Sequence, residues 1–85
     1  MEIIYSKRFK KEYKKRPENI RKAFKKRLKI FCDDKFHPIL NNHKLNGEYD
    51  NYRSFNITAD WRVIFEEKEN QIILLAIGSH SELYS

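Results

Sequence analysis

The sequence predicts a single α+β domain over residues 1–85, in which a helical hairpin packs on one face of a mainly antiparallel, four-stranded, twisted sheet. Two observations lead to this prediction. The N-terminal half has the 3.6-residue apolar period of amphipathic helices, and the C-terminal half has three closely spaced runs rich in β-branched and aromatic residues. A short apolar run at the start adds a fourth strand, so the predicted order is β-α-α-β-β-β.

The N-terminal half contains one predicted strand and two predicted helices. Residues Glu2–Tyr5 form the strand, and Ser6 is a suitable N-cap for a helix that extends to about residue 16. Pro17 ends this helix because proline disfavours helical geometry in the residue before it. A second helix, from Glu18 to about Cys32, has an apolar face and an opposite basic face. The basic face consists of Arg21, Lys22, Lys25, Lys26 and Lys29.

Three strand-like runs follow one another in the C-terminal half. They cover residues Tyr52–Thr58, Trp61–Glu66 and Gln71–Ile77, and the short connections between them favour an antiparallel meander. Residues Asn41–Gly47 are expected to form the loop that enters the meander, and Gly47 permits a positive φ there. Residues Gly78–Tyr84 remain as a C-terminal tail.

Alternation along the strands predicts which side chains face the helices. Successive strand residues point to opposite faces, so Phe55 and Val63 belong to apolar sets that suit the helix side. Asn56 and Arg62 are then left on the open face. Arg53 falls on the apolar side, where we expect its side chain to reach the sheet edge or to pair with a carboxylate.

The net charge of +6 is unevenly distributed along the chain. Residues 1–42 contain 14 Lys and Arg and 5 Asp and Glu, whereas residues 43–85 contain 4 and 7. This segregation favours a basic N-terminal surface that binds a polyanion such as RNA, although lysine-rich helices also serve solubility. No apolar run approaches the roughly 20 residues of a membrane span, and no secretory signal is visible. We therefore expect a cytoplasmic protein with no membrane partner.

Several kinds of chemistry are not predicted. The two glycines do not form a phosphate-binding loop, and the one cysteine has no partner for a disulfide or a zinc site. His37, His43 and His80 include no pair at helical i,i+4 spacing. We therefore expect neither a metal nor a cofactor.

The remaining polar residues suit metal-independent cleavage of RNA. The ribose 2′-hydroxyl is an internal nucleophile, so the enzyme needs only a base, an acid and a cation that stabilises the crowded phosphate. Histidine, with an ordinary pKa of about 6.5, can act as base or acid near neutrality. Arginine provides a charge that is not lost by deprotonation. Histidines of this kind are more often structural, so the composition alone leaves both readings open.

Four segments together resemble the RelE/ParE toxin superfamily, and most closely its YafQ-like branch. They are His43-Lys44-Leu45-Asn46-Gly47, Tyr52-Arg53, Asp60-Trp61, and Gly78-Ser79-His80-Ser81-Glu82-Leu83-Tyr84. The resemblance implies the toxin of a type II toxin–antitoxin system, a ribosome-dependent endoribonuclease that cleaves mRNA. It also implies a cognate antitoxin as partner, with a monomer when free and a hetero-oligomer in the complex.

The resemblance assigns roles to individual residues. His43 and His80 fall on the family's acid/base histidines, and their two roles stay open. Arg62 is the expected phosphate ligand, Tyr84 the terminal aromatic that contacts a base or donates a hydroxyl, and Asp60 part of the Asp-Trp pair. The expected RNA-binding residues are Arg53, Trp61, Lys44, Lys22, Lys25, Lys26 and Lys29.

Some residues depart from the YafQ-like pattern or have a simpler explanation. Ala76 stands where that pattern has an arginine, and Asn56 where it has a histidine. Asp60 also suits a simple turn, and Trp61 simple packing. Two alternative functions therefore stay open: a ParE-like inhibitor of DNA gyrase, and a toxin fold that binds its partners without catalysis.

Overall fold

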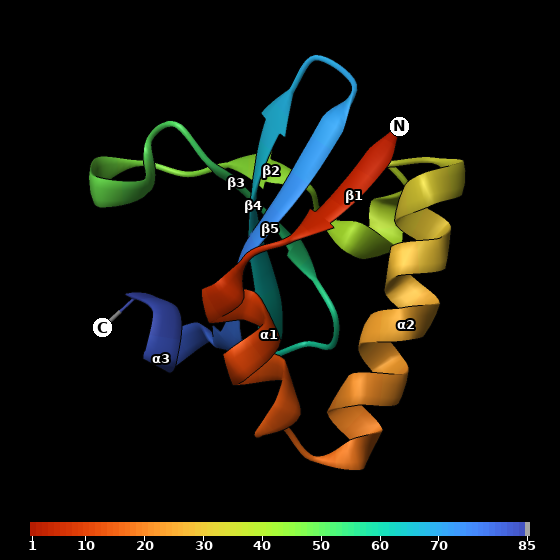
Figure 1. The fold of residues 1–85 in the computed structure, drawn as a ribbon, viewed down its shortest axis with the longest axis vertical. Coiled ribbons are helices and arrows are strands. Elements are labelled where there is room, and N and C mark those ends of the chain that lie inside the picture. Colours follow the sequence, from red (N-terminus) through yellow and green to blue (C-terminus); the bar gives the residue numbers. More distant parts are fainter. Residues whose placement is uncertain (85) are drawn as a thin grey trace.

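The computed structural model describes residues 1–84 and contains a five-stranded sheet with helices on both faces (Figure 1). The elements in chain order are β1 (Glu2–Tyr5), α1 (Lys7–Lys14), α2 (Glu18–Asp33), β2 (His43–Lys44), β3 (Arg53–Asn56), β4 (Trp61–Lys68), β5 (Gln71–Ser79) and α3 (His80–Tyr84). Two 3₁₀ turns, Pro38–Leu40 and Gly47–Tyr49, flank β2. None of the helices in this part of the chain is long and apolar enough to span a membrane.

The sheet has the order β1-β5-β4-β3-β2, in which β1 is parallel to β5 and all other neighbours are antiparallel. The α+β class, the helical hairpin and the antiparallel meander are confirmed. The predicted number of four strands was wrong, because His43 and Lys44 pair with Ser54 and Arg53 and form a short fifth strand. A two-residue strand has no periodicity that a sequence pattern could reveal.

Local sequence signals explain the start of each long helix. The Ser6 hydroxyl accepts a hydrogen bond from the Phe9 N–H at 3.0 Å, which caps α1 as predicted. Pro17 separates the two helices, and Glu18 lies in the first turn of α2, where a negative charge is favourable. In the loop before β3, Gly47 has a φ of 66°, the positive value that its sequence context predicts.

The main core lies between the helical hairpin and one face of the sheet. Phe9 of α1 and Phe24 and Phe31 of α2 pack against the buried strand residues Phe55, Ile57, Val63, Phe65, Ile72, Leu74 and Ile77. The alternation predicted for β3 and β4 is therefore confirmed. The basic side of α2 faces solvent, and Figure 1 shows that this helix forms the outer layer on its side of the molecule.

The opposite face of the sheet is partly covered, although an open face was expected. Leu45, Ile64, Ala76 and Leu83 form a second buried cluster there. The cover comes from the loop after β2 and from α3. The predicted C-terminal tail thus folds into a helix and occupies part of this face.

A β-bulge interrupts the pairing of β4 with β5. Ile64 pairs with Ala76 and the next residue, Phe65, pairs with Leu74, so Leu75 has no partner on β4. Leu74 and Ile77 consequently both face the helix side, although residues three apart in a regular strand face opposite sides. The carbonyl oxygen of Leu75 accepts a hydrogen bond from the Ser6 hydroxyl at 3.3 Å.

Candidate active site

The strand register places several predicted site residues on the face opposite α1 and α2. Residues directly opposite each other in an antiparallel sheet point to the same face. One cross-strand row contains His43, Ser54, Ile64 and Ala76, and the next row contains Asn56, Arg62 and Gly78. His43 and Arg62 therefore share a face, about 10 Å apart across the sheet and about 7 Å along it, from standard strand spacings.

Arg62 is held by its cross-strand neighbour. Its Nη1 donates a hydrogen bond to Oδ1 of Asn56 at 2.6 Å, and both side chains are half-buried. This one bond uses one of the five N–H donors of the guanidinium. The bond fixes the side chain, and the guanidinium retains N–H groups that can bind an anion.

His80 and Tyr84 lie on α3, at the same end of the sheet as Arg62. The His80 N–H donates to the carbonyl oxygen of Asp60 at 2.8 Å, which fixes the start of α3 two residues after the partner of Arg62. The rings of His80 and Tyr84 meet edge to face with centroids 4.8 Å apart. His80 is exposed, whereas the Tyr84 hydroxyl is buried and has no hydrogen-bond partner among residues 1–84.

The orientation of the His43 ring follows from one hydrogen bond. Its Nδ1 lies 2.8 Å from the carbonyl oxygen of Asn41, a residue in the left-handed region with a φ of 47°. A carbonyl oxygen only accepts, so Nδ1 carries the hydrogen. In the neutral ring Nε2 is then unprotonated, and the exposed edge of His43 is a proton acceptor.

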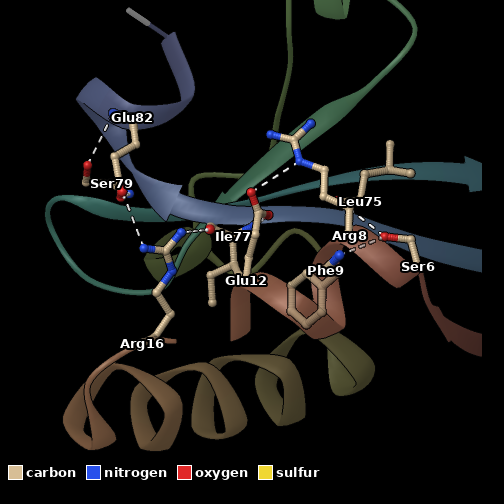
Figure 2. Close-up of polar contacts among 9 residues, drawn as sticks. All are labelled: Ser6, Arg8, Phe9, Glu12, Arg16, Leu75, Ile77, Ser79 and Glu82. Atoms are coloured by element: carbon tan, nitrogen blue, oxygen red, sulfur yellow. Dashed lines mark hydrogen bonds and ion pairs between the residues drawn. The ribbon is translucent and has the colours of Figure 1, made fainter. Parts of the chain in front are cut away.

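Glu82 is the residue that anchors α3. Its Oε1 accepts a hydrogen bond from the Ser79 N–H at 2.8 Å, and its own N–H donates to the Ser79 hydroxyl at 3.2 Å. Its Oε2 lies 3.3 Å from Nη1 of Arg16 (Figure 2). The hydrogen bond from the Ser79 backbone, aided by Arg16, lowers the pKa of the Glu82 carboxyl.

We expect the anchoring by Glu82 to depend on pH. Because its pKa is lowered in the folded protein, ionised Glu82 contributes stability above the ordinary carboxyl pKa of 4.5, and this contribution is lost as the pH falls through the lower folded value. The Glu82→Gln variant should therefore be less stable than the wild type near pH 7, and the difference should shrink in acid. Urea denaturation at several pH values measures it. A difference that is constant down to acid pH would contradict this assignment.

A sequence model of the family described as bacterial toxin of type II toxin–antitoxin system, YafQ, matches residues 1–85. The chain belongs to the YafQ family of toxins. A search of curated proteins gave no significant match.

Solved structures agree on the fold. YafQ from E. coli has a TM-score of 0.84 at 18% identity, with 99% of this chain and 98% of that chain covered. The toxin chain in the E. coli DinJ-YafQ complex has a TM-score of 0.71 at 22% identity, with 99% and 98% covered. The match to the RelB-RelE antitoxin–toxin complex from Methanococcus jannaschii has a TM-score of 0.75 at 23% identity, with 95% and 94% covered.

The two departures from the YafQ-like pattern have clear structural settings. Ala76 is 1% exposed and packs with Leu45, Ile64 and Leu83, so a longer side chain at this position would displace α3 or the loop after β2. Asn56 accepts the hydrogen bond that fixes Arg62. Within residues 1–84, Arg62 is the one arginine that the strand pairing places on this face of the sheet.

The remaining predicted RNA-binding residues of this YafQ-family chain lie on the helix side. Lys44 pairs with Arg53, and both point to the face of Phe65. Arg53 does not pair with a carboxylate as one expectation held: its Nε donates to Oδ1 of Asn42 at 2.8 Å, and its guanidinium lies over the ring of Phe36.

Trp61 and the lysines of α2 are also separate from His43 and Arg62. The Trp61 ring packs against the main core and lies under the guanidinium of Arg16, 5.1 Å from the ring centroid. Lys22, Lys25, Lys26 and Lys29 are exposed along α2. The structure thus places Arg62, His80, Tyr84 and Asp60 at one end of the sheet. His43 lies on the same face, on the edge strand β2. In the described part of the chain, no three His, Cys, Asp or Glu side chains form a group that could hold a metal ion.

Sequence reasoning missed the residues that fix α3. Ser79 and Glu82 form a capping box, in which the side chain of each residue accepts a hydrogen bond from the backbone N–H of the other. The Ser-x-x-Glu spacing is a sequence signal that could have predicted this helix. The contact of Arg16 with Glu82 joins residues 66 positions apart, and no local pattern indicates it.

Proposed function

We propose that this YafQ-family toxin is a ribosome-dependent endoribonuclease that cleaves mRNA without a catalytic metal. The observation that supports this proposal is the placement of α3, with His80 and Tyr84, at the end of the sheet where Arg62 binds Asn56, on the face that also carries His43. Together these side chains offer a base, an acid and a fixed cation for cleavage of a phosphodiester. Family membership supports the same class of activity.

In the proposed reaction His43 is the base and His80 the acid. Nε2 of His43 takes the proton of the ribose 2′-hydroxyl, and the 2′-oxygen forms a bond to phosphorus. The bond from phosphorus to the 5′-oxygen breaks, and His80 gives its proton to that leaving oxygen. The products are a 2′,3′-cyclic phosphate and a 5′-hydroxyl. The hydrogen bond that leaves Nε2 of His43 unprotonated supports this division of roles.

Arg62 and Tyr84 have supporting roles in this proposal. The guanidinium of Arg62 stabilises the negative charge that develops on the phosphate, and it needs no reorganisation because Asn56 already holds it. Tyr84 contacts the flanking base through its ring, because its hydroxyl is buried. Asp60 acts through its backbone, because its carbonyl oxygen fixes the N–H of His80.

The basic helix layer is proposed to bind the ribosome. The exposed lysines of α2 face away from the site, so they are available for ribosomal RNA while mRNA lies on the opposite face of the sheet. Many phosphate contacts of this kind would make binding strongly dependent on salt. We further propose a cytoplasmic location and a cognate antitoxin, by analogy with the toxins in the DinJ-YafQ and RelB-RelE complexes.

The test is cleavage of a defined mRNA by the purified protein, with and without programmed ribosomes. We expect cleavage at one position within a codon only when ribosomes are present, with 2′,3′-cyclic phosphate and 5′-hydroxyl ends. An mRNA with a 2′-O-methyl group at the cleaved nucleotide should resist cleavage, because the internal nucleophile is blocked. Intact mRNA together with inhibition of DNA gyrase would refute the proposal in favour of a ParE-like activity. Intact mRNA without gyrase inhibition would favour a non-catalytic binding protein.

A further inference from the structure

The helix α3 is too short to hold its own position. It has five residues, and isolated helices of this length are not stable in water. Its placement therefore depends on contacts with the rest of the protein. Leu83 supplies an apolar contact, since it is 6% exposed and packs close to Gly78, where an added Cβ would lie 3.2 Å from the leucine.

The polar anchor of α3 is Glu82, and both of its carboxylate oxygens are used. Oε1 accepts from the Ser79 N–H and completes the capping box, while Oε2 binds Arg16. Figure 2 shows Arg16 reaching from the end of α1 to Glu82. The anchor thus joins the last helix to the first.

Arg16 is itself fixed before it reaches Glu82. Its Nη2 donates to the carbonyl oxygen of Ile77 on β5 at 2.8 Å, and its guanidinium stacks over Trp61. Its side chain is only 16% exposed. An ordinary surface ion pair is weak because two long side chains must be ordered. Here the guanidinium is already ordered by Ile77 and Trp61, so its contact with Glu82 can determine where α3 lies.

The edge of β5 that β1 leaves unpaired explains why Arg16 lies close enough to contact α3. The strand β1 pairs with β5 only as far as Leu74. Beyond this point the backbone of Ile77 is bound by two side chains: its N–H donates to Glu12 on α1, and its carbonyl oxygen accepts from Arg16, two residues after α1. The residue that completes this edge is therefore also the one that contacts α3.

We propose that Arg16, acting through Glu82, is a positioning residue that sets the orientation of α3 and hence of His80 and Tyr84. This inference rests on the proposed function for its catalytic consequence. His80 directly follows Ser79, and Tyr84 is two residues after Glu82, so a rotation of α3 moves both rings. Misplacement by about 1 Å can cost about 10²-fold in rate.

The kinetic test compares Arg16→Gln, Glu82→Gln and the double variant in ribosome-dependent cleavage. We expect each single variant to lower kcat by about 10-fold to 100-fold with KM changed by less than about 2-fold, since positioning acts on the chemical step. The double variant should be no slower than the slower single variant, because both substitutions break one contact. Arg16→Lys should be intermediate, because an ammonium lacks the fork that binds Ile77 and Glu82 together.

Arg8→Gln is the matched control. Arg8 lies on α1 and, like Arg16, pairs with a glutamate, here Glu12 at 3.2 Å, but its side chain is 58% exposed and it does not contact α3. This variant loses the same charge from the helix that precedes Arg16, and we expect wild-type kcat. An equal loss of kcat in Arg8→Gln and Arg16→Gln would overturn the proposal, because the effect would then come from charge alone.

A second measurement does not depend on catalysis. The Tyr84 ring meets the ring of Tyr49, in the 3₁₀ turn after β2, edge to face with centroids 6.3 Å apart, so in the NMR spectrum a ring-current shift of the Tyr49 protons reports where α3 lies. Arg16→Gln and Glu82→Gln should reduce this shift while the amide signals of β3 and β4 are retained. Unchanged Tyr49 signals in both variants would overturn the positioning role. If the variants reduce this shift but the wild-type protein cleaves no mRNA, the positioning role is supported and the proposed nuclease function is refuted.

Discussion

Replacing His80 with glutamine should lower the rate of ribosome-dependent mRNA cleavage by about 10²-fold to 10⁴-fold, which is the typical contribution of a general acid or base. Glutamine keeps a polar side chain of similar length but cannot give a proton to the leaving 5′-oxygen. Single-turnover cleavage of a programmed mRNA measures the chemical step directly. The exposed position of His80 predicts that the fold tolerates the substitution.

A chemical rescue distinguishes loss of the acid from a general disturbance of the site. With a sulfur in place of the 5′-bridging oxygen, the leaving group departs without a proton. This substrate should restore cleavage by His80→Gln but not by His43→Gln, because His43 is the proposed base. His37→Gln is the control, since Nδ1 of His37 caps the 3₁₀ turn Pro38–Leu40 and the residue lies outside the site. Rescue of His43→Gln alone would reverse the two roles, and undiminished cleavage by His80→Gln would exclude catalysis by His80.

Replacing Arg62 with glutamine should lower kcat by about 10²-fold to 10³-fold with little change in KM, as for other groups that stabilise charge in the transition state. The reason is specific to this chain. Ala76 provides no cation at the position where the YafQ-like pattern has an arginine, so Arg62 is the proposed source of positive charge on this face. The measurement is the concentration dependence of cleavage on programmed ribosomes.

Two further variants sharpen the interpretation of Arg62. Arg62→Lys retains the charge but not the planar fork, so we expect a loss smaller than that of Arg62→Gln. Lys68→Gln removes a positive charge from the other end of the same strand, where the side chain is 60% exposed, and should leave kcat unchanged. If Arg62→Gln raised KM and left kcat intact, Arg62 would bind the substrate equally in the ground state and the transition state. The proposed role would then be wrong.

The sequence predicted the parts of the fold that have a regular period. The apolar face of α2 and the alternation of β3 and β4 produced the correct core residues, since these patterns depend only on neighbours along the chain. The parts that were missed depend on partners far away. The pairing of His43–Lys44 with β3 and the extension of β5 to Ser79 are tertiary features that propensity does not report.

The candidate site was predictable to a similar degree. Alternation correctly placed Asn56 and Arg62 on the face away from the hairpin, and the resemblance to the toxin family directed attention to His43 and His80. The hydrogen bond from Arg62 to Asn56 and the tautomer of His43 follow only from the three-dimensional structure. The position of Arg16 could not be inferred, because its contacts with Ile77 and Glu82 exist only once α1 lies along the edge of β5.

The bulge at Leu75 means that β5 contains one residue more than its pairing with β4 requires. A toxin without Leu75 would still pair Ala76 with Ile64 and Gly78 with Arg62, so both faces of the sheet would keep their side chains. Loss of a single residue between Ala76 and His80 would instead shift the residues that follow it to the opposite face, so that His80 would lie toward the hairpin. Length variation among related toxins is therefore compatible with the fold at the bulge, whereas the four-residue spacing from Ala76 to His80 must be kept.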